Sequence, residues 1–192
     1  MDNKEIYDRY VLEFKKRFDE RFTPEVKRYA DYFLRKLKGK KILDLGCGTG
    51  SHLQYFQERG FDAVGIDFSR GMVNLCKEQG FEVKVMDMND LSFPDKTFDG
   101  IWISASLLHI SGDRIPNIVD SVKRILKKNG IIYVSVKEGK GDYVENNGYH
   151  RHFFLYSDQE VRDFFSDFEL LYFSKNKSPK GGMFLNYLLR LK

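Results

Sequence analysis

The chain has 192 residues, of which 42% are hydrophobic and 31% charged, and its formal net charge is +4. These values are typical of one globular domain with its own core, and they argue against a low-complexity or disulfide-dependent chain. The presence of only two cysteines favours a reducing, cytoplasmic setting. The sequence has no apolar leader and no apolar run of about 18 residues, so we expect that the protein is neither exported nor inserted in a membrane.

The basic surplus lies in the first 41 residues, where 13 Lys and Arg stand against 8 Asp and Glu, while the rest of the chain has 19 against 20. These charges fall on the outer faces of predicted helices, so solvation explains them and we do not expect a nucleic acid partner. Aromatic and aliphatic residues at helical spacing predict one amphipathic helix over residues 4–22. Thr23 and Pro24 begin a second helix, as N-cap and first helical residue, and Gly39 ends it.

Residues 42–50 read Ile-Leu-Asp-Leu-Gly-Cys-Gly-Thr-Gly, a short apolar strand that runs into a glycine loop and then a helix. Glycines let the backbone turn tightly and approach a ligand, and the N–H groups of the helix face the same space. Ser51 stands where the dinucleotide fingerprint G-x-G-x-x-G requires its third glycine. This spacing disfavours a nicotinamide-dependent oxidoreductase, an alternative that a titration with NADH would test.

Strand and helix patterns alternate from residue 41 onward. We predict strands at 41–45, 62–67, 81–86, 98–104 and 131–136, with helices at 50–59, 70–79 and 114–128 between them. This alternation is typical of a doubly wound parallel α/β sheet. The carboxyl ends of parallel strands meet at one edge, so Asp67 and the glycine loop should face the same crevice, with Asp87 after the third strand.

Residues 137–156 break the pattern and are predicted as a variable segment without regular structure that lines the substrate. Ser157 and Glu160 form a capping box that begins another helix, and residues 168–174 and 183–191 read as a hairpin. The chain contains no repeat or linker, so we expect a single domain over residues 1–192: N-terminal helices to residue 39, a cofactor-binding core over 40–136, the variable segment, and a closing helix and hairpin over 157–192.

The strand, acid and glycine pattern of residues 42–50, with Asp67 and Asp87, resembles the motifs of the class I S-adenosylmethionine-dependent methyltransferases, in particular small single-domain members that act on small molecules. The specific motifs cover about residues 40–136. The resemblance implies a Rossmann-like sheet of seven strands in the order 3-2-1-4-5-7-6, the last strand antiparallel. It also implies S-adenosylmethionine as cofactor and S-adenosylhomocysteine as product.

In this resemblance Asp44 and the glycine loop hold the methionine part of the cofactor, Asp67 holds the ribose, and Asp87 with Met88 holds the adenine. The candidate cofactor-binding residues are Tyr10, Asp44, Gly46, Cys47, Gly48, Gly50, Asp67, Phe68, Met72, Asp87, Met88 and Ser104. Each has a plainer alternative: Asp44 tying down the loop, Asp67 and Asp87 as turn residues, Phe68 and Met72 as core. An N-terminal helix with a tyrosine acts as a lid in similar enzymes, which makes Tyr7 or Tyr10 a lid candidate.

Methyl transfer is an in-line displacement that needs a base only when the nucleophile carries a proton. Histidine suits that task because its pKa is near neutral. The candidates are His109, after the fourth strand, and His150 and His152, in the variable segment; their alternatives are a packing residue and two solvated loop residues. The acceptor pocket candidates are Asp142, Tyr143, Glu145, Tyr149 and Arg151.

The fourth strand ends in Ser104-Ala105-Ser106-Leu107, where methyltransferases of DNA-base amino groups or glutamine side chains have an Asn/Asp-Pro-Pro-aromatic motif. A small-molecule acceptor is therefore the main expectation. The alternatives are an RNA or protein substrate that uses the basic N-terminal helices, or a non-catalytic cofactor-binding regulatory module. We expect no metal site, because Cys47 and Cys76 lie far apart without a histidine cluster, and a monomer or homodimer.

Overall fold

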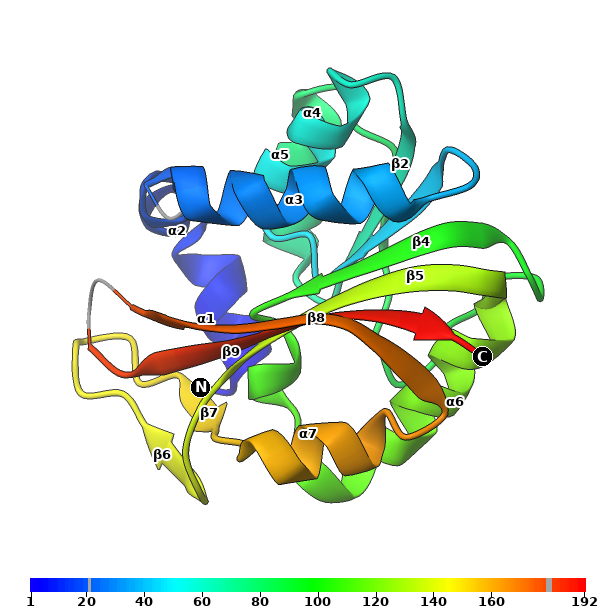
Figure 1. The fold of residues 1–192 in the computed structure, drawn as a ribbon. Helices are drawn as coiled ribbons and strands as arrows, with labels where there is room; N and C mark the ends of the chain where they lie inside the picture. Colours follow the sequence, from blue (N-terminus) through cyan, green and yellow to red (C-terminus); the bar gives the residue numbers. More distant parts are fainter. Residues whose placement is uncertain (21, 179–180) are drawn as a thin grey trace.

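The computed structural model describes residues 1–20, 22–178 and 181–192. A seven-stranded mixed sheet forms its centre, with the strand order β3-β2-β1-β4-β5-β9-β8 (Figure 1). The strands are β1 (Lys41–Leu45), β2 (Asp62–Asp67), β3 (Val83–Val85), β4 (Phe98–Ser104), β5 (Leu126–Lys137), β8 (Phe168–Lys177) and β9 (Met183–Leu191). Strands β1 to β5 are parallel, and β9 lies antiparallel between β5 and β8. The predicted Rossmann-like α/β architecture is thus confirmed.

The strand numbering differs in detail from the predicted order 3-2-1-4-5-7-6, because the chain forms two more strands than expected. Strands β6 (Asp142–Val144) and β7 (His152–Phe154) pair antiparallel as a separate hairpin. The expectation that residues 137–156 lack regular structure was therefore wrong. The hairpin is stabilised by contacts from the N-terminal helix, which lies far away in sequence.

The N-terminal region contains three helices, α1 (Asn3–Arg9), α2 (Val11–Asp19) and α3 (Pro24–Lys36). The single predicted helix over residues 4–22 was wrong, since it breaks at Tyr10, where φ is −114° and ψ is 37°. The break lets Ile6 and Tyr7 of α1 and Phe14 of α2 bury their side chains in one cluster with Met72. Helix α3 begins as predicted, with the Thr23 hydroxyl accepting from the Val26 amide.

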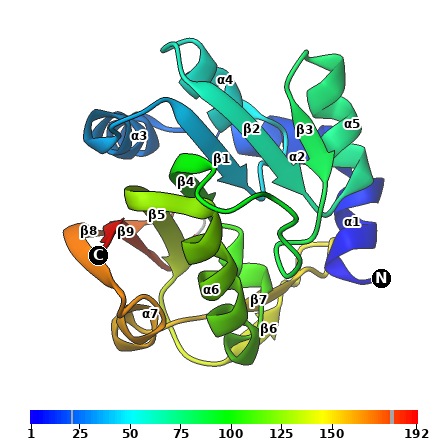
Figure 2. The same cartoon turned by 90° about the vertical axis from the view of Figure 1, so that its right-hand side faces the viewer.

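Helices cover both faces of the sheet (Figure 2). Helices α3, α4 (Ser51–Gln57) and α5 (Arg70–Glu78) pack on one face, and α6 (Ile115–Ile125) and α7 (Asp158–Phe164) pack on the other. Side chains alternate between these two cores along β5, with Tyr133 facing α3 and Val134 facing α6. Trp102 stacks on Tyr133 with ring centroids 3.8 Å apart.

Helix α6 ends at Ile125 rather than at the predicted residue 128, because β5 already begins at Leu126, opposite Phe98 of β4. The strand then bulges, with a left-handed Asn129 at φ 60°, before it resumes pairing at Ile131 opposite Gly100. Two 3₁₀ turns, η1 (Leu107–His109) and η2 (Gly112–Arg114), connect β4 to α6. The first of these turns carries His109 to the carboxyl edge of the sheet.

No helix in the described part of the chain is both long enough and apolar enough to cross a bilayer.

Candidate cofactor and acceptor site

A cavity of about 980 Å³ opens at the carboxyl ends of the parallel strands. Helices α1 and α2 and the β6–β7 hairpin contribute to its walls, together with the loops after β1, β2, β3 and β4. The predicted cofactor residues that line it are Gly46, Cys47, Gly48, Asp67, Phe68, Met72, Asp87, Met88 and Ser104. The structure thus brings the three expected strand ends together at one site.

Backbone N–H groups of the glycine loop after β1 hold the loop to the end of β2. The N–H groups of Gly46 and Cys47 both donate to the carbonyl of Ile66, at 2.9 Å, and that of Gly48 donates to Oδ2 of Asp67, at 2.9 Å. Gly46 has φ +83°, and a Cβ there would lie 2.5 Å from the Cβ of Ser106. The loop therefore needs glycine for both conformation and space.

Asp67 ends β2 and ties the loop to helix α5. Its carboxylate also accepts from the Ser69 amide, at 2.9 Å, and the residue is only 7% exposed. Burial raises the pKa of Asp67 to about 6, although the backbone hydrogen bonds from Ser69 and Gly48 act in the opposite direction. A carboxylate fixed in this way presents its remaining lone pairs in a defined direction.

Asp44 lies behind the loop and is 1% exposed, and neither of its carboxylate oxygens has a hydrogen-bond partner. Nδ1 of His52 lies 3.8 Å from Oδ2 of Asp44, too far for a hydrogen bond. Burial lowers the pKa of His52 to about 4, so this imidazole is neutral, and burial raises the pKa of Asp44 well above its usual range. A buried acid without a partner is costly in the free protein and fits a positively charged ligand group.

The other predicted cofactor residues differ in their surroundings. Asp87 is exposed and accepts from the Asn89 amide, at 2.9 Å, while Phe68 and Met72 contribute both to the cavity wall and to packing under α1. Three predicted residues are not among those that line the cavity: Asp44, which is buried behind the glycine loop, Gly50, the N-cap of α4, and Tyr10, whose ring lies 5.1 Å from that of Tyr149. Of the two lid candidates, only Tyr7 reaches it.

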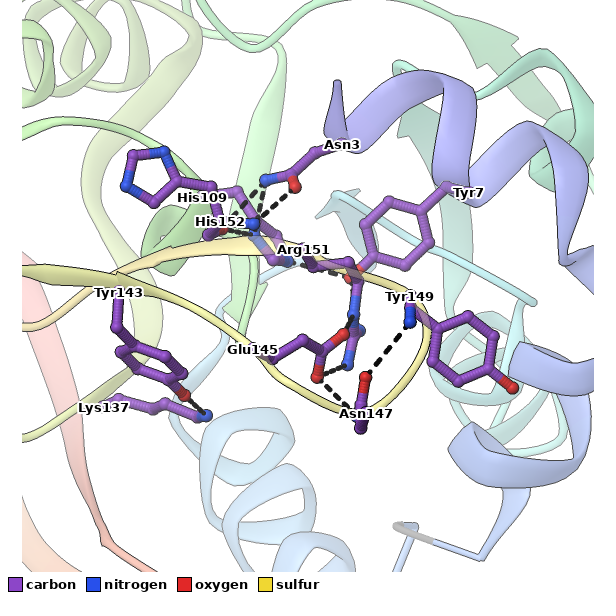
Figure 3. A network of polar contacts seen from close by, with 10 residues as sticks. All are labelled: Asn3, Tyr7, His109, Lys137, Tyr143, Glu145, Asn147, Tyr149, Arg151 and His152. Carbon is purple, nitrogen blue, oxygen red and sulfur yellow. Dashed lines mark hydrogen bonds and ion pairs between the residues drawn. The ribbon is translucent and has the colours of Figure 1, made fainter. Parts of the chain in front are cut away.

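A polar network around Tyr7 and His109 forms another part of the cavity wall (Figure 3). The Tyr7 hydroxyl lies 2.8 Å from Nε2 of His109, and Nη1 of Arg151 donates to the same hydroxyl, at 2.8 Å. Arg151 is 2% exposed and forms a bidentate ion pair with Glu145, in which Nη2 lies 2.9 Å from Oε2. Burial lowers the pKa of His109 to about 3, so its imidazole is neutral.

Asn3 connects helix α1 to the hairpin through both backbone polar groups of His152. Its Nδ2 donates to the His152 carbonyl, at 2.9 Å, and its Oδ1 accepts from the His152 amide, at 2.8 Å. Asp8 docks the same helix on α5, where its carboxylate accepts from Ser69 Oγ and the Gly71 amide. Helix α1 is thus bonded to both the cofactor side and the hairpin side of the cavity.

The three candidate histidines have different environments. His109 belongs to the network, whereas the ring of His152 is 42% exposed and contacts Asp142, and His150 is exposed with a left-handed φ of 60°. Tyr143 accepts from Lys137, and Tyr149 packs on Phe14 of α2. Within the described residues, no group of three or more His, Cys, Asp or Glu side chains is arranged to hold a metal ion.

Sequence reasoning did not find Asn3 or Lys137, and it gave Arg151 and Glu145 only as separate pocket candidates. No local motif marks Asn3, which follows the first two residues of the chain. The spacing of Glu145 and Arg151 across a turn of the hairpin was the one available signal for their ion pair.

A Rossmann-like sheet with a glycine loop after β1 and carboxylates after β2 and β3 defines the class of nucleoside-binding α/β domains used by methyltransferases. A family model described as "Methyltransferase domain" matches residues 43–134. This part of the chain matches the family of methyltransferase domains, in agreement with the resemblance to the class I S-adenosylmethionine-dependent family.

Similar proteins support this assignment. Phosphoethanolamine N-methyltransferase 3 of Arabidopsis thaliana is 29% identical over 183 residues, covering 85% of this chain and 37% of the relative, so the chain spans little more than a third of that protein's length. A Burkholderia thailandensis 1,6-didemethyltoxoflavin-N1-methyltransferase with bound S-adenosylhomocysteine superposes with a TM-score of 0.79 at 18% identity, covering 98% of this chain and 87% of that one. A Methanosarcina mazei S-adenosylmethionine-dependent methyltransferase superposes with a TM-score of 0.75 at 18% sequence identity, covering 88% of this chain and 97% of that one. At this identity the two structures show a shared fold.

Proposed function

We propose that this protein transfers a methyl group from S-adenosylmethionine to a small-molecule acceptor. The observation that carries the proposal is that one cavity joins the strand-end carboxylates to the Tyr7–His109 pair. The first group of residues suits an adenosyl ligand, and the second suits a nucleophile that must lose a proton. Because both groups line one cavity, an acceptor and the cofactor would bind side by side, which supports the proposal.

The residues present fit the cofactor. When bound, S-adenosylmethionine supplies an electrophilic methyl group on a sulfonium centre. Asp67 would accept from the ribose hydroxyls, and Asp87 with Met88 would hold the adenine, while Phe68 and Met72 cover its faces. The buried, unpaired acid of Asp44 favours the ammonium of the methionine part.

Arg17 is placed to bind the carboxylate of that methionine part. It lines the cavity from α2, next to Phe18, whose ring lies 3.3 Å from the position of a Cβ on Gly48. Its Nε is buried without a hydrogen-bond partner, and its guanidinium lies 4.9 Å from the centroid of the Tyr149 ring. A guanidinium whose Nε lacks a partner matches a carboxylate, which can accept two parallel hydrogen bonds.

The Tyr7–His109 pair provides a path for the proton of the acceptor. In this proposal the acceptor donates its proton to the Tyr7 oxygen as the Tyr7 proton moves to Nε2 of His109. Burial keeps His109 neutral, so its Nε2 lone pair is available at physiological pH, while the lowered pKa of about 3 makes it a weaker base than the near-neutral histidine expected from the sequence. Helix α1 and the hairpin, which join over this end of the cavity, exclude water from it.

A nitrogen nucleophile is the first acceptor class to test. The Arabidopsis relative and the Burkholderia structure are both named as N-methyltransferases, the former of phosphoethanolamine and the latter of a toxoflavin precursor. A protonated nitrogen cannot attack, so such an acceptor makes use of the Tyr7–His109 pair. Thiols, which ionise more easily, would depend on it less.

The test is formation of S-adenosylhomocysteine with a panel of small acceptors, amines first and then phenols, carboxylates and thiols. Calorimetric titration should show that the protein binds S-adenosylhomocysteine and that Asp67→Ala weakens binding by about 1–3 kcal/mol through lost charged hydrogen bonds. Absence of binding at millimolar ligand would contradict the proposal. Binding without turnover on any acceptor would favour a non-catalytic module, and turnover on RNA that falls steeply with salt would favour a polymer substrate.

A further inference from the structure

We infer that Arg151 is a positioning residue for this reaction: paired with Glu145, it orients the Tyr7 hydroxyl and thereby fixes the tautomer of His109. The catalytic part of this inference rests on the proposed function. Its structural part concerns the protein without any ligand and is tested separately.

The arginine side chain can donate hydrogen bonds but cannot accept them. Nη1 of Arg151 lies 2.8 Å from the Tyr7 oxygen, so this oxygen must accept. The hydroxyl proton of Tyr7 then has to point elsewhere, and Nε2 of His109, also 2.8 Å away, is the acceptor within reach. Nε2 of His109 therefore carries no proton.

The other ring nitrogen agrees with this assignment. A neutral imidazole has one proton, so it lies on Nδ1, which is 2.9 Å from the His152 carbonyl and can donate to it. Asn3 Nδ2, itself only a donor, lies 3.0 Å from the same ring nitrogen; in this tautomer it makes no hydrogen bond to Nδ1 and donates instead to the carbonyl, whose two lone pairs receive both donors. One donor-only side chain thus sets the direction of three hydrogen bonds (Figure 3).

Arg151 is itself held firmly, as a positioning residue requires. Glu145 binds Nε and Nη2, and Asn147 donates to the Glu145 carboxylate, at 2.8 Å. The guanidinium also packs on the rings of Phe14 and Phe153, 4.8 and 4.9 Å from their centroids. A planar, bidentate and stacked group has little freedom to turn, which is why lysine is not an equivalent replacement.

The charge of Arg151 acts on the same pair. The charged groups that face Tyr7 and His109 are Arg151 and Glu145 from the hairpin, Lys137 from β5 and Asp67 from β2. Burial sets the main shifts, raising the pKa of Tyr7 and lowering that of His109, and the positive charge of Arg151 lowers both. Removal of Arg151 should therefore raise the pKa of His109.

The structural test is ¹⁵N NMR of the imidazoles in the free protein, comparing wild type with Arg151→Met and assigning His109 by its loss in His109→Gln. We expect the Nδ1–H tautomer in wild type, and in Arg151→Met a mixture of tautomers with an upward shift of the His109 titration. Arg162→Met, which removes an exposed arginine paired with Asp158 at 2.9 Å, is the matched control and should leave His109 unchanged. An unchanged tautomer and titration in a folded Arg151→Met protein would overturn the inference.

The kinetic test compares kcat with the KM for the acceptor. Arg151→Met should lower kcat about 10- to 100-fold and shift the acidic limb of the pH profile upward, with Arg151→Lys intermediate. Glu145→Gln keeps the arginine but replaces its ion pair with weaker hydrogen bonds, so it should show the same changes to a smaller extent. This variant serves as the test if Arg151→Met fails to fold. A rise in KM alone would mean that Arg151 binds the acceptor and would overturn positioning. Lack of turnover in wild type would refute the proposed function and leave the NMR result standing.

Discussion

Two parts of the site satisfy their polar groups in different ways. The cofactor end comprises the glycine loop with Asp44 and Asp67, and the acceptor end comprises the network of Tyr7, His109 and Arg151. At the cofactor end, buried atoms of Asp44 and Thr49 have no hydrogen-bond partner. At the acceptor end, Tyr7, His109 and Arg151 are all hydrogen-bonded to one another or to neighbours. The cofactor end therefore gains partners when a ligand binds, whereas at the acceptor end a ligand has to replace contacts that already exist. Such an exchange favours acceptors whose polar groups can substitute for the broken hydrogen bonds.

The largest expected effect is that of Gly46→Ala at the cofactor end. The new Cβ would lie 2.5 Å from the Cβ of Ser106, at a position with φ +83°. Overpacking and the left-handed backbone together should lower the free energy of unfolding by about 2–5 kcal/mol and abolish binding of S-adenosylhomocysteine. Urea denaturation and calorimetric titration measure the two effects.

Gly80→Ala is the matched control, because Gly80 has φ +86° but no atom within 4 Å of the added Cβ. It should cost about 1 kcal/mol, the backbone contribution alone, and leave cofactor binding intact. Equal losses in the two variants would show that the loop tolerates the added methyl group and that the cofactor end is less tightly built than its geometry indicates.

Asp67 gives the cofactor end a characteristic pH dependence. Its pKa is about 6 in the folded protein against a usual 3.8, so the folded state holds this proton more tightly than the unfolded chain does. The protonated form favours folding, and that contribution is lost as pH rises through the window between the two pKa values. Relative to Asp67→Asn, the wild type should lose about 2.4 kcal/mol of unfolding free energy between pH 4 and pH 7.

Denaturation curves of both proteins at several pH values test this expectation, and their difference cancels the titration of His52 and His109. If the difference in unfolding free energy between wild type and Asp67→Asn stayed constant with pH, Asp67 would keep an ordinary pKa. Wild type gaining stability with rising pH relative to the variant would reverse the sign of the argument.

Asp44→Asn should separate stability from binding. The buried acid has no partner in the free protein, and its raised pKa means that it disfavours folding above the pKa of the unfolded chain. Replacing it with the neutral amide should raise the free energy of unfolding by about 1–3 kcal/mol at pH 7, with a smaller gain near pH 4. The same change should weaken the binding of S-adenosylhomocysteine, because the negative charge opposite its ammonium group is lost. Loss of stability together with tighter binding would contradict the assignment.

The cofactor end is also the part that the sequence predicted best, because its groups are contiguous or follow at strand ends. Leu45, Asp67 and Ser104 end their strands as predicted, and the parallel sheet brings them together without further information. The acceptor end depends on contacts that no local pattern encodes. Tyr7 and Arg151 are 144 residues apart, and Tyr7 and His109 are 102 apart.

The errors in the fold have the same origin. The break at Tyr10 and the β6–β7 hairpin both form where the N-terminal helices meet residues 142–154, and helical periodicity or glycine content cannot report such a meeting. Tertiary burial of Phe14 and Tyr149 decides the local conformation there. Of the three candidate histidines, His109 brings its ring into the polar network from η1, whereas His150 and His152 have exposed rings in the segment itself.

Asn3→Ala is expected to have the smallest effect and to act only at the acceptor end. It removes the two hydrogen bonds between α1 and the backbone of His152, which should cost about 1 kcal/mol. Since Asn3 bonds this helix to the hairpin backbone and η1 also contacts β7, the loss should appear as local opening: faster amide hydrogen exchange across residues 142–154, with Ile132 and Val134 of β5 unchanged. Faster exchange in β5 as well would mean that the hairpin and the sheet open as one unit, and that the two ends of the cavity are not energetically separate.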